Sequence, residues 1–130
     1  MLPTTELTEM NASNAERRLE ELISLRSDLT VVPASRAPAS RILGPVTEGF
    51  FSKYSSLSTA TKSLEIALDS IAPSSYFDGC FAIGHYEYWE LVIKPGEDIV
   101  YVVDGSEADL SETDARYENI YEYLVDELAG

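Results

Sequence analysis

The sequence predicts an α+β fold, in which an antiparallel sheet of at least three strands carries N-terminal helices and a C-terminal helix packed on it. Two observations predict this class. Apolar residues recur at helical spacing in the first half of the chain and at its end. Between Cys80 and Val103 they alternate instead, as in strands. The 130 residues are enough for one domain with a real core, and helices followed by consecutive strands favour helices on one face of the sheet.

The first helix is expected over residues 14–28. Ser13 followed by Glu16 matches a capping box, and leucines follow at helical spacing. The polar residues 1–12 before it are expected to be a flexible leader. The single domain is therefore predicted to span residues 13–130.

Two more helices are expected before the sheet. Residues 30–41, with two prolines and small polar side chains, predict a connector, in which Val31-Val32 can form a short extended piece. A short helix should run from Pro45 to about Tyr54, because proline is favoured at the first helical position. Ser58 predicts the cap of a third helix, which Pro73 ends.

Three consecutive antiparallel strands are expected over residues 80–84, 86–93 and 98–103, because β-branched and aromatic residues alternate there. A final helix is expected over residues 113–128, with Ser111 in the capping position. Its predicted apolar stripe consists of Tyr117, Tyr121, Leu124 and Leu128.

The charge of the chain is strongly negative and unevenly distributed. The formal net charge is −14, and the segment from Glu97 to Gly130 holds eleven carboxylates and one cation, Arg116. Nucleic acids and anionic membranes need clustered Lys and Arg, so neither is expected as a partner. The single cysteine, Cys80, cannot form a disulfide within the chain, and the N-terminal residues lack the features of a signal peptide. A reducing, cytoplasmic location is expected.

The acidic C-terminal segment is the predicted partner-binding surface. Glu118, Glu122 and Asp126 stack at intervals of four residues along the expected helix, one turn after Asp114. Like charges at this spacing are mildly destabilising, so they form either a solvated face or a stripe that meets Lys and Arg on a partner. Tyr123 falls off the apolar stripe and is expected to be exposed. The predicted binding residues are Glu107, Asp109, Glu112, Glu118, Glu122 and Tyr123.

No clear catalytic or metal motif occurs, so no enzyme activity, metal or cofactor is expected. Strand alternation would place His85, Glu87 and Trp89 on one side, but one histidine is a weak basis for zinc. Cys80 opens an apolar strand and is expected to be a buried, inert thiol. The acidic residues after Asp98 lack the ligand spacing of a calcium loop.

The order of these segments resembles the SUKH superfamily of Smi/Knr-like proteins. The resemblance lies mainly in the C-terminal half, where an Ile-Gly strand, an aromatic strand, a Gly turn, a strand ending at aspartate, an acidic loop and an aromatic helix follow one another. These are Ala82-Ile83-Gly84, Tyr86–Ile93, Pro95-Gly96, Val100–Asp104, residues 105–112, and Tyr117 to Leu128. The N-terminal half departs from the pattern, with Tyr54-Ser55-Ser56-Leu57 where the family has Asn-Gly.

The resemblance implies a SUKH-like fold and a cytoplasmic immunity protein, which neutralises a cognate toxin by stoichiometric binding. The acidic surface implies a toxin with a basic face. Two alternatives stay open. One is a regulatory or scaffold module of the same superfamily, and the other is a small hydrolase that uses His85 and nearby carboxylates.

Overall fold

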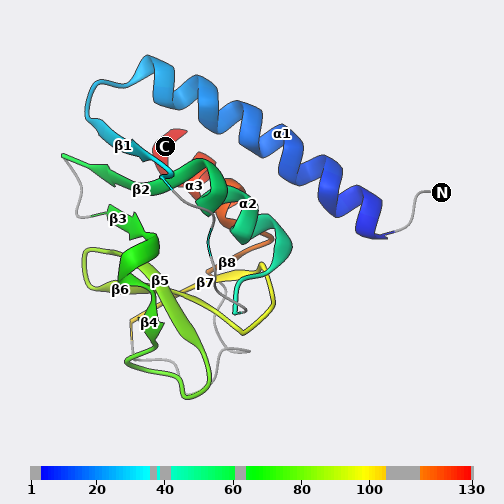
Figure 1. Ribbon diagram of the computed structural model, residues 1–130, viewed down its shortest axis with the longest axis vertical. Helices are drawn as coiled ribbons and strands as arrows, with labels where there is room; N and C mark the ends of the chain where they lie inside the picture. Colours follow the sequence, from blue (N-terminus) through cyan, green and yellow to red (C-terminus); the bar gives the residue numbers. More distant parts are fainter. Residues whose placement is uncertain (1–3, 36–37, 39–41, 61–63, 105–114, 130) are drawn as a thin grey trace.

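The structure is a computed structural model that describes residues 4–35, 38, 42–60, 64–104 and 115–129, with side chains from Ala12 onward. It has the predicted α+β class, with helices from both ends of the chain beside one antiparallel sheet (Figure 1). The helices are α1 (Thr4–Leu25), α2 (Pro45–Lys53) and α3 (Ile120–Ala129), and a short 3-10 turn covers Leu68–Ser70. The strands are β1 (Leu29–Pro33), β2 (Tyr54–Thr59), β3 (Leu64–Ala67), β4 (Ala72–Pro73), β5 (Phe81–Tyr86), β6 (Trp89–Ile93), β7 (Val100–Val103) and β8 (Arg116–Tyr117).

The eight strands form one sheet in the order β1-β2-β3-β5-β6-β7-β8, and β4 pairs with β5 beside β3. Every described pairing is antiparallel. The strands β5, β6 and β7 confirm the three predicted consecutive strands, but β5 runs on to Tyr86, which was predicted in the second strand, and β6 begins only at Trp89. In Figure 1, α1 runs along one side of the molecule, and α2 and α3 lie between it and the sheet.

The main core fills the space between the three helices and one face of the sheet. Alternation along the strands decides which residues enter it. On β6, Leu91 and Ile93 belong to the main core, whereas Val92 between them packs in a smaller cluster with Cys80 and Tyr101. The helices contribute Leu19, Leu22, Phe50, Phe51, Ile120, Tyr121, Tyr123, Leu124 and Leu128 to the main core.

The helix α1 differs from the predicted first helix at both ends. It begins at Thr4 and ends at Leu25, so most of the expected leader is helical, and residues 1–3 lie outside the described part. Ser13 therefore lies within the helix and does not cap it. The C-terminal end is set by Arg26, whose guanidinium pairs with Asp28 at 2.6 Å and donates to the carbonyl of Leu128 at 2.7 Å.

The third predicted helix is wrong, because its described residues belong to the end of β2, to β3, to the 3-10 turn and to β4. Ser58 lies in β2 and pairs with Glu65 of β3. Leu57 and Ile66, a directly opposed pair, are both fully buried in the core. β2 pairs with β1 and β3, and β3 also pairs with β5, so this segment is held in the sheet. Tertiary contacts of this kind override a short helical pattern.

The second predicted helix is confirmed, and its N-terminus is held by a distant carboxylate. Asp98 accepts hydrogen bonds from the backbone N–H of Thr47 at 2.9 Å and from its hydroxyl at 3.0 Å. It also accepts from the N–H of Val46 at 3.2 Å. A side chain at Gly44 would place its Cβ 2.4 Å from the Asp98 carboxylate, so only glycine permits this approach.

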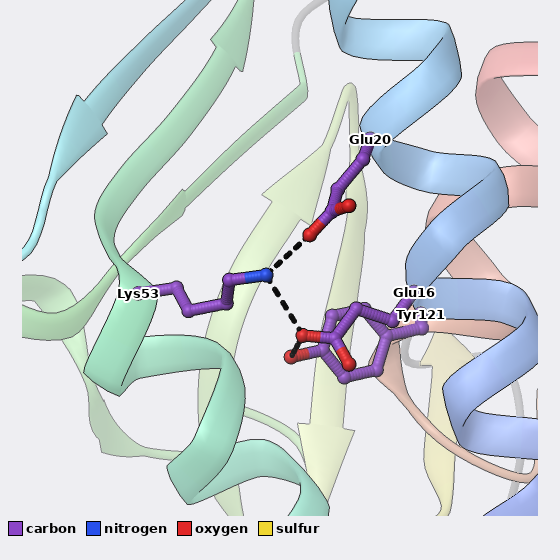
Figure 2. A network of polar contacts seen from close by, with 4 residues as sticks. All are labelled: Glu16, Glu20, Lys53 and Tyr121. Atoms are coloured by element: carbon purple, nitrogen blue, oxygen red, sulfur yellow. Dashed lines mark hydrogen bonds and ion pairs between the residues drawn. The ribbon is translucent and has the colours of Figure 1, made fainter.

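A polar network joins the three helices (Figure 2). The ammonium of Lys53 on α2 lies 3.0 Å from Glu16 and also pairs with Glu20, both on α1. The Tyr121 hydroxyl of α3 donates to the same Glu16 oxygen at 3.5 Å. The hydrogen bonds to the two carboxylates raise the pKa of Lys53, so its ammonium is stabilised as the charged form.

The last helix begins seven residues later than predicted. Arg116 and Tyr117 form the strand β8, which pairs with β7, and α3 starts at Ile120. The amide oxygen of Asn119 accepts the N–H of Glu122 at 3.0 Å, so Asn119 caps the helix. The predicted cap, Ser111, lies outside the described residues.

Candidate functional site

An acidic pocket of about 840 Å³ opens between α1, β8 and the start of α3. Among the described residues, three carboxylates line it: Glu118 just before α3, and Glu122 and Asp126 in the first and second turns of the helix. The other lining residues are Asn14, Ala15, Ile99, Arg116, Tyr117 and Val125. We call this site the acidic pocket.

The carboxylates of the acidic pocket lie near one another, and the cation among the described lining residues is Arg116. Burial raises the pKa of Glu122, and the negative charge of Glu118 raises it further. The Tyr117 hydroxyl donates to Asp126 at 2.7 Å. Burial is the larger cause and this hydrogen bond the second cause that raise the pKa of Tyr117 to about 12. A cation in the pocket would offset the repulsion between Glu118 and Glu122, so the pocket is suited to a positively charged group.

The structure brings together two of the predicted binding residues. Glu118 is exposed and Glu122 is half-buried, and both line the acidic pocket. Asp126 lines the acidic pocket as well. The expected helical stack of three carboxylates is not formed, because Glu118 lies before the start of α3. Glu107, Asp109 and Glu112 lie outside the described residues.

The prediction that Tyr123 is exposed is wrong. Its side chain is only 2% exposed and belongs to the main core. The ring of Tyr117 on β8 packs edge-on against the ring of Tyr123, with centroids 5.2 Å apart. The sequence pattern placed Tyr117 on the same helix, and it therefore missed the strand that covers Tyr123.

A second, smaller cavity lies on the other side of Tyr117. Its volume is about 250 Å³, and its lining residues are Tyr86, Trp89, Val102, Ala115, Tyr117, Tyr123 and Glu127. Four of the seven are aromatic, and we call this site the aromatic cavity. The crowding of Tyr86, Tyr88 and Trp89 in the sequence was a signal for it, but the cavity also needs Tyr117 and Tyr123 from distant segments.

His85, Glu87 and Trp89 do not share one strand face as expected, because Trp89 pairs with Tyr86, but all three line one hollow of about 180 Å³. His85 is exposed on β5, where its direct neighbours across the sheet are Glu65 and Glu90. Glu87 lies in the turn between β5 and β6 and shares no strand with His85. Within the described part of the chain, no group of three His, Cys, Asp or Glu side chains is placed to hold a metal ion.

Cys80 lies in the smaller cluster under Val92 and Tyr101 and is buried. Burial raises the pKa of its thiol, and the positive charge of Lys94 opposes this shift only in part. A thiol held in its protonated form is a poor nucleophile, so this environment is that of an unreactive cysteine.

None of the helices in the described ranges is long and apolar enough to cross a membrane. No protein-family model, no curated protein and no solved structure matches this chain.

Proposed function

We propose that this chain is an immunity protein, which neutralises a cognate toxin by stoichiometric binding through the acidic pocket. The observation that carries the proposal is the convergence of Glu118, Glu122 and Asp126 on one concave site. The net charge of −14 supports it, because such a field attracts a basic partner from a distance.

The chemistry of the pocket suits a toxin that acts on nucleic acid. An enzyme of that kind exposes Lys and Arg where it grips phosphates. Carboxylates in a concave site imitate those phosphates, and a bound acidic protein blocks the entrance. Burial and then the charge of Glu118 raise the pKa of Glu122, and a basic side chain that enters the pocket would relieve the repulsion between the two carboxylates.

The same pocket also supports a second candidate in the same class, a regulatory module that binds an endogenous basic protein. The two are distinguished by the partner. An immunity protein is expected to have a toxin gene directly upstream of its own gene, and it should protect cells that express that toxin.

The test is a neutralisation assay with the neighbouring toxin, together with association kinetics. We expect toxin activity to fall to zero at equimolar protein. The association rate should fall as salt rises, because the Debye length shrinks from about 10 Å at 0.1 M to about 3 Å at 1 M. Reversal of the pocket charges, Glu118→Lys with Glu122→Lys, should slow association about ten-fold or more.

A matched control variant carries the same change in net charge elsewhere. Glu65→Lys with Glu97→Lys reverses two exposed carboxylates that do not line the acidic pocket. Circular dichroism should show that both double variants stay folded. Equal slowing by the two variants would contradict the pocket as the contact, and failure of the unaltered protein to protect cells would contradict the immunity function.

A further inference from the structure

The aromatic cavity is built from two ring pairs that come from different parts of the fold. Tyr86 and Trp89, from the hairpin of β5 and β6, stack with centroids 5.8 Å apart and an interplanar angle of 11°. Tyr117 of β8 and Tyr123 of α3 form the edge-to-face pair, at 5.2 Å and 76°. The carboxylate residue Glu127 completes the lining on the α3 side.

The hairpin holds its two rings together by a strained turn. Tyr86 and Trp89 are directly opposite each other in the register, so both side chains lie on the same side of the sheet. Only Glu87 and Tyr88 connect them, and Glu87 has a φ of 53°, a value that glycine adopts more readily. Such strain persists where the surrounding structure or a function requires the geometry.

The cavity lining also contains a buried polar atom without a partner. The Tyr123 hydroxyl is shielded from solvent and has no hydrogen-bond partner among the described residues. A buried hydroxyl in this state costs stability, and in native proteins it usually has a reason. The hydroxyl has almost no accessible surface, so a ligand with N–H donors reaches it only by displacing a side chain around it, and such a ligand is one reason.

We propose that the aromatic cavity binds one alkylammonium or guanidinium group. Aromatic faces attract cations, and cages of Tyr and Trp are a known solution for them. The local field has the matching sign: burial raises the pKa of Tyr123, and the negative charges of Glu127 and Asp126 raise it further.

The size of the cavity fits one such group. Its volume of about 250 Å³ is several times the roughly 30 Å³ that a water molecule takes up in the liquid. It is also below the range of about 300–1,000 Å³ that is usual for drug-sized ligands. A cation with a chain of about four carbons is larger than a water molecule and smaller than a drug-sized ligand. The side chains of lysine and arginine and small free amines are cations of this size.

This site is separate from the acidic pocket, and the inference does not depend on the proposed function. Among the described residues, only Tyr117 lines both sites. If no toxin bound the acidic pocket, the proposal for the aromatic cavity would still stand. If no cation bound the aromatic cavity, the proposal for the acidic pocket would still stand. The two experiments can therefore fail independently.

Trp89 makes the test direct, because it is the only tryptophan in the chain and it lines the cavity. Butylammonium and butylguanidinium are titrated into the full chain, and Trp89 fluorescence is followed. The neutral analogue 1-butanol is the control for shape, and sodium chloride at equal ionic strength is the control for general attraction to the negative chain. We expect saturable quenching by the two cations and none by either control.

Three variants separate the cavity from its surroundings. Tyr86→Leu removes one ring and should weaken cation binding about five-fold, within the range of one cation–π contact. Tyr123→Phe keeps the ring and removes the hydroxyl, and it should weaken binding about three-fold, the cost of one modest hydrogen bond. The matched control is Tyr88→Leu, since Tyr88 belongs to the same hairpin but is 90% exposed and does not line the cavity.

The proposal is overturned if 1-butanol quenches as strongly as butylammonium, or if no cation gives a saturable change. It is also overturned if Tyr88→Leu weakens binding as much as Tyr86→Leu. The source of the cation is read from a further arm with N-acetyl-lysine methylamide. Binding at least as tight as that of butylammonium supports a protein side chain, and binding of butylammonium alone supports a small free amine.

Discussion

At Tyr123, one hydroxyl group lowers the stability of the fold and also serves the proposed cation site. This hydroxyl is buried without a partner among the described residues, and only the ring contributes to the main core. We predict that Tyr123→Phe stabilises the protein by about 1 kcal/mol, because it removes an unsatisfied buried group without creating a cavity. Urea unfolding in the absence of any amine would measure the change.

The matched comparison is Tyr117→Phe, which removes a hydroxyl that does have a partner. Tyr117 donates to Asp126 at 2.7 Å at the edge of the acidic pocket. This variant should be neutral or destabilising by up to about 1 kcal/mol. If Tyr123→Phe were the more destabilising of the two, its hydroxyl must have a partner that the described residues do not supply.

The burial of a residue was predictable from the sequence where it depends only on the face of its own helix. Tyr121, Leu124 and Leu128 recur at helical spacing, and all three are buried as predicted. Tyr123 has no such signal, because its cover comes from Tyr117 on β8 and not from its own helix. A sequence pattern reports the face of an element, and it does not report what another element adds to that face.

At the scale of elements, the start of α3 depends on one fully buried side chain. Asn119 accepts the N–H of Glu122 at 3.0 Å, and it replaces a cap that the sequence placed at Ser111. We predict that Asn119→Ala destabilises the protein by about 1–2 kcal/mol, the usual cost of a lost cap. Thermal or urea unfolding would measure it.

The variant Asn119→Ser is the control, because serine can also cap a helix. It should recover part of the loss, since the Nδ2 of Asn119 has no partner in the described structure and its removal costs little. Equal destabilisation by alanine and serine would show that the volume of Asn119, and not its cap, holds the start of α3.

Elements with a single clear period were predictable, and those with mixed periods were not. The strands β5, β6 and β7 and the helix α2 follow one pattern each, and the sequence predicts them. In β3, the residues Leu64 and Ile66 alternate around exposed Glu65, but the neighbouring Ala67 and Leu68 also match a helical face. Pairing with β2 and β5 decided the outcome, and a local window does not contain those partners.

At the scale of the whole molecule, the class was predictable and the two sites only in part. The order of patterns indicates an α+β chain, but the strand order depends on pairings that no local pattern encodes. The acidic character of the C-terminal segment was evident from its charges. The concave shape of the acidic pocket was not, because α1 and β8 supply walls from segments about 100 residues apart.

The distribution of buried tyrosines across the molecule predicts how its stability responds to alkali. Burial raises the pKa of Tyr54, Tyr117, Tyr121 and Tyr123 above the ordinary value of 10.0, and that of Tyr117 to about 12. The folded state therefore keeps these protons while the unfolded chain loses them. Stability should be unaffected by these groups below about pH 9 and should fall from about pH 10 to about pH 12.

Lys53 acts in the same direction, since its hydrogen bonds to Glu20 and Glu16 raise its pKa. Its contribution is present below the ordinary value of 10.5 and is lost as the pH rises further. Urea midpoints at about pH 8 and about pH 11 would show the fall, and Tyr117→Phe should make it shallower because one linked proton is gone. Midpoints that do not change with pH would mean that the tyrosines ionise in the folded state, and tyrosinate absorbance of the native protein would show this directly.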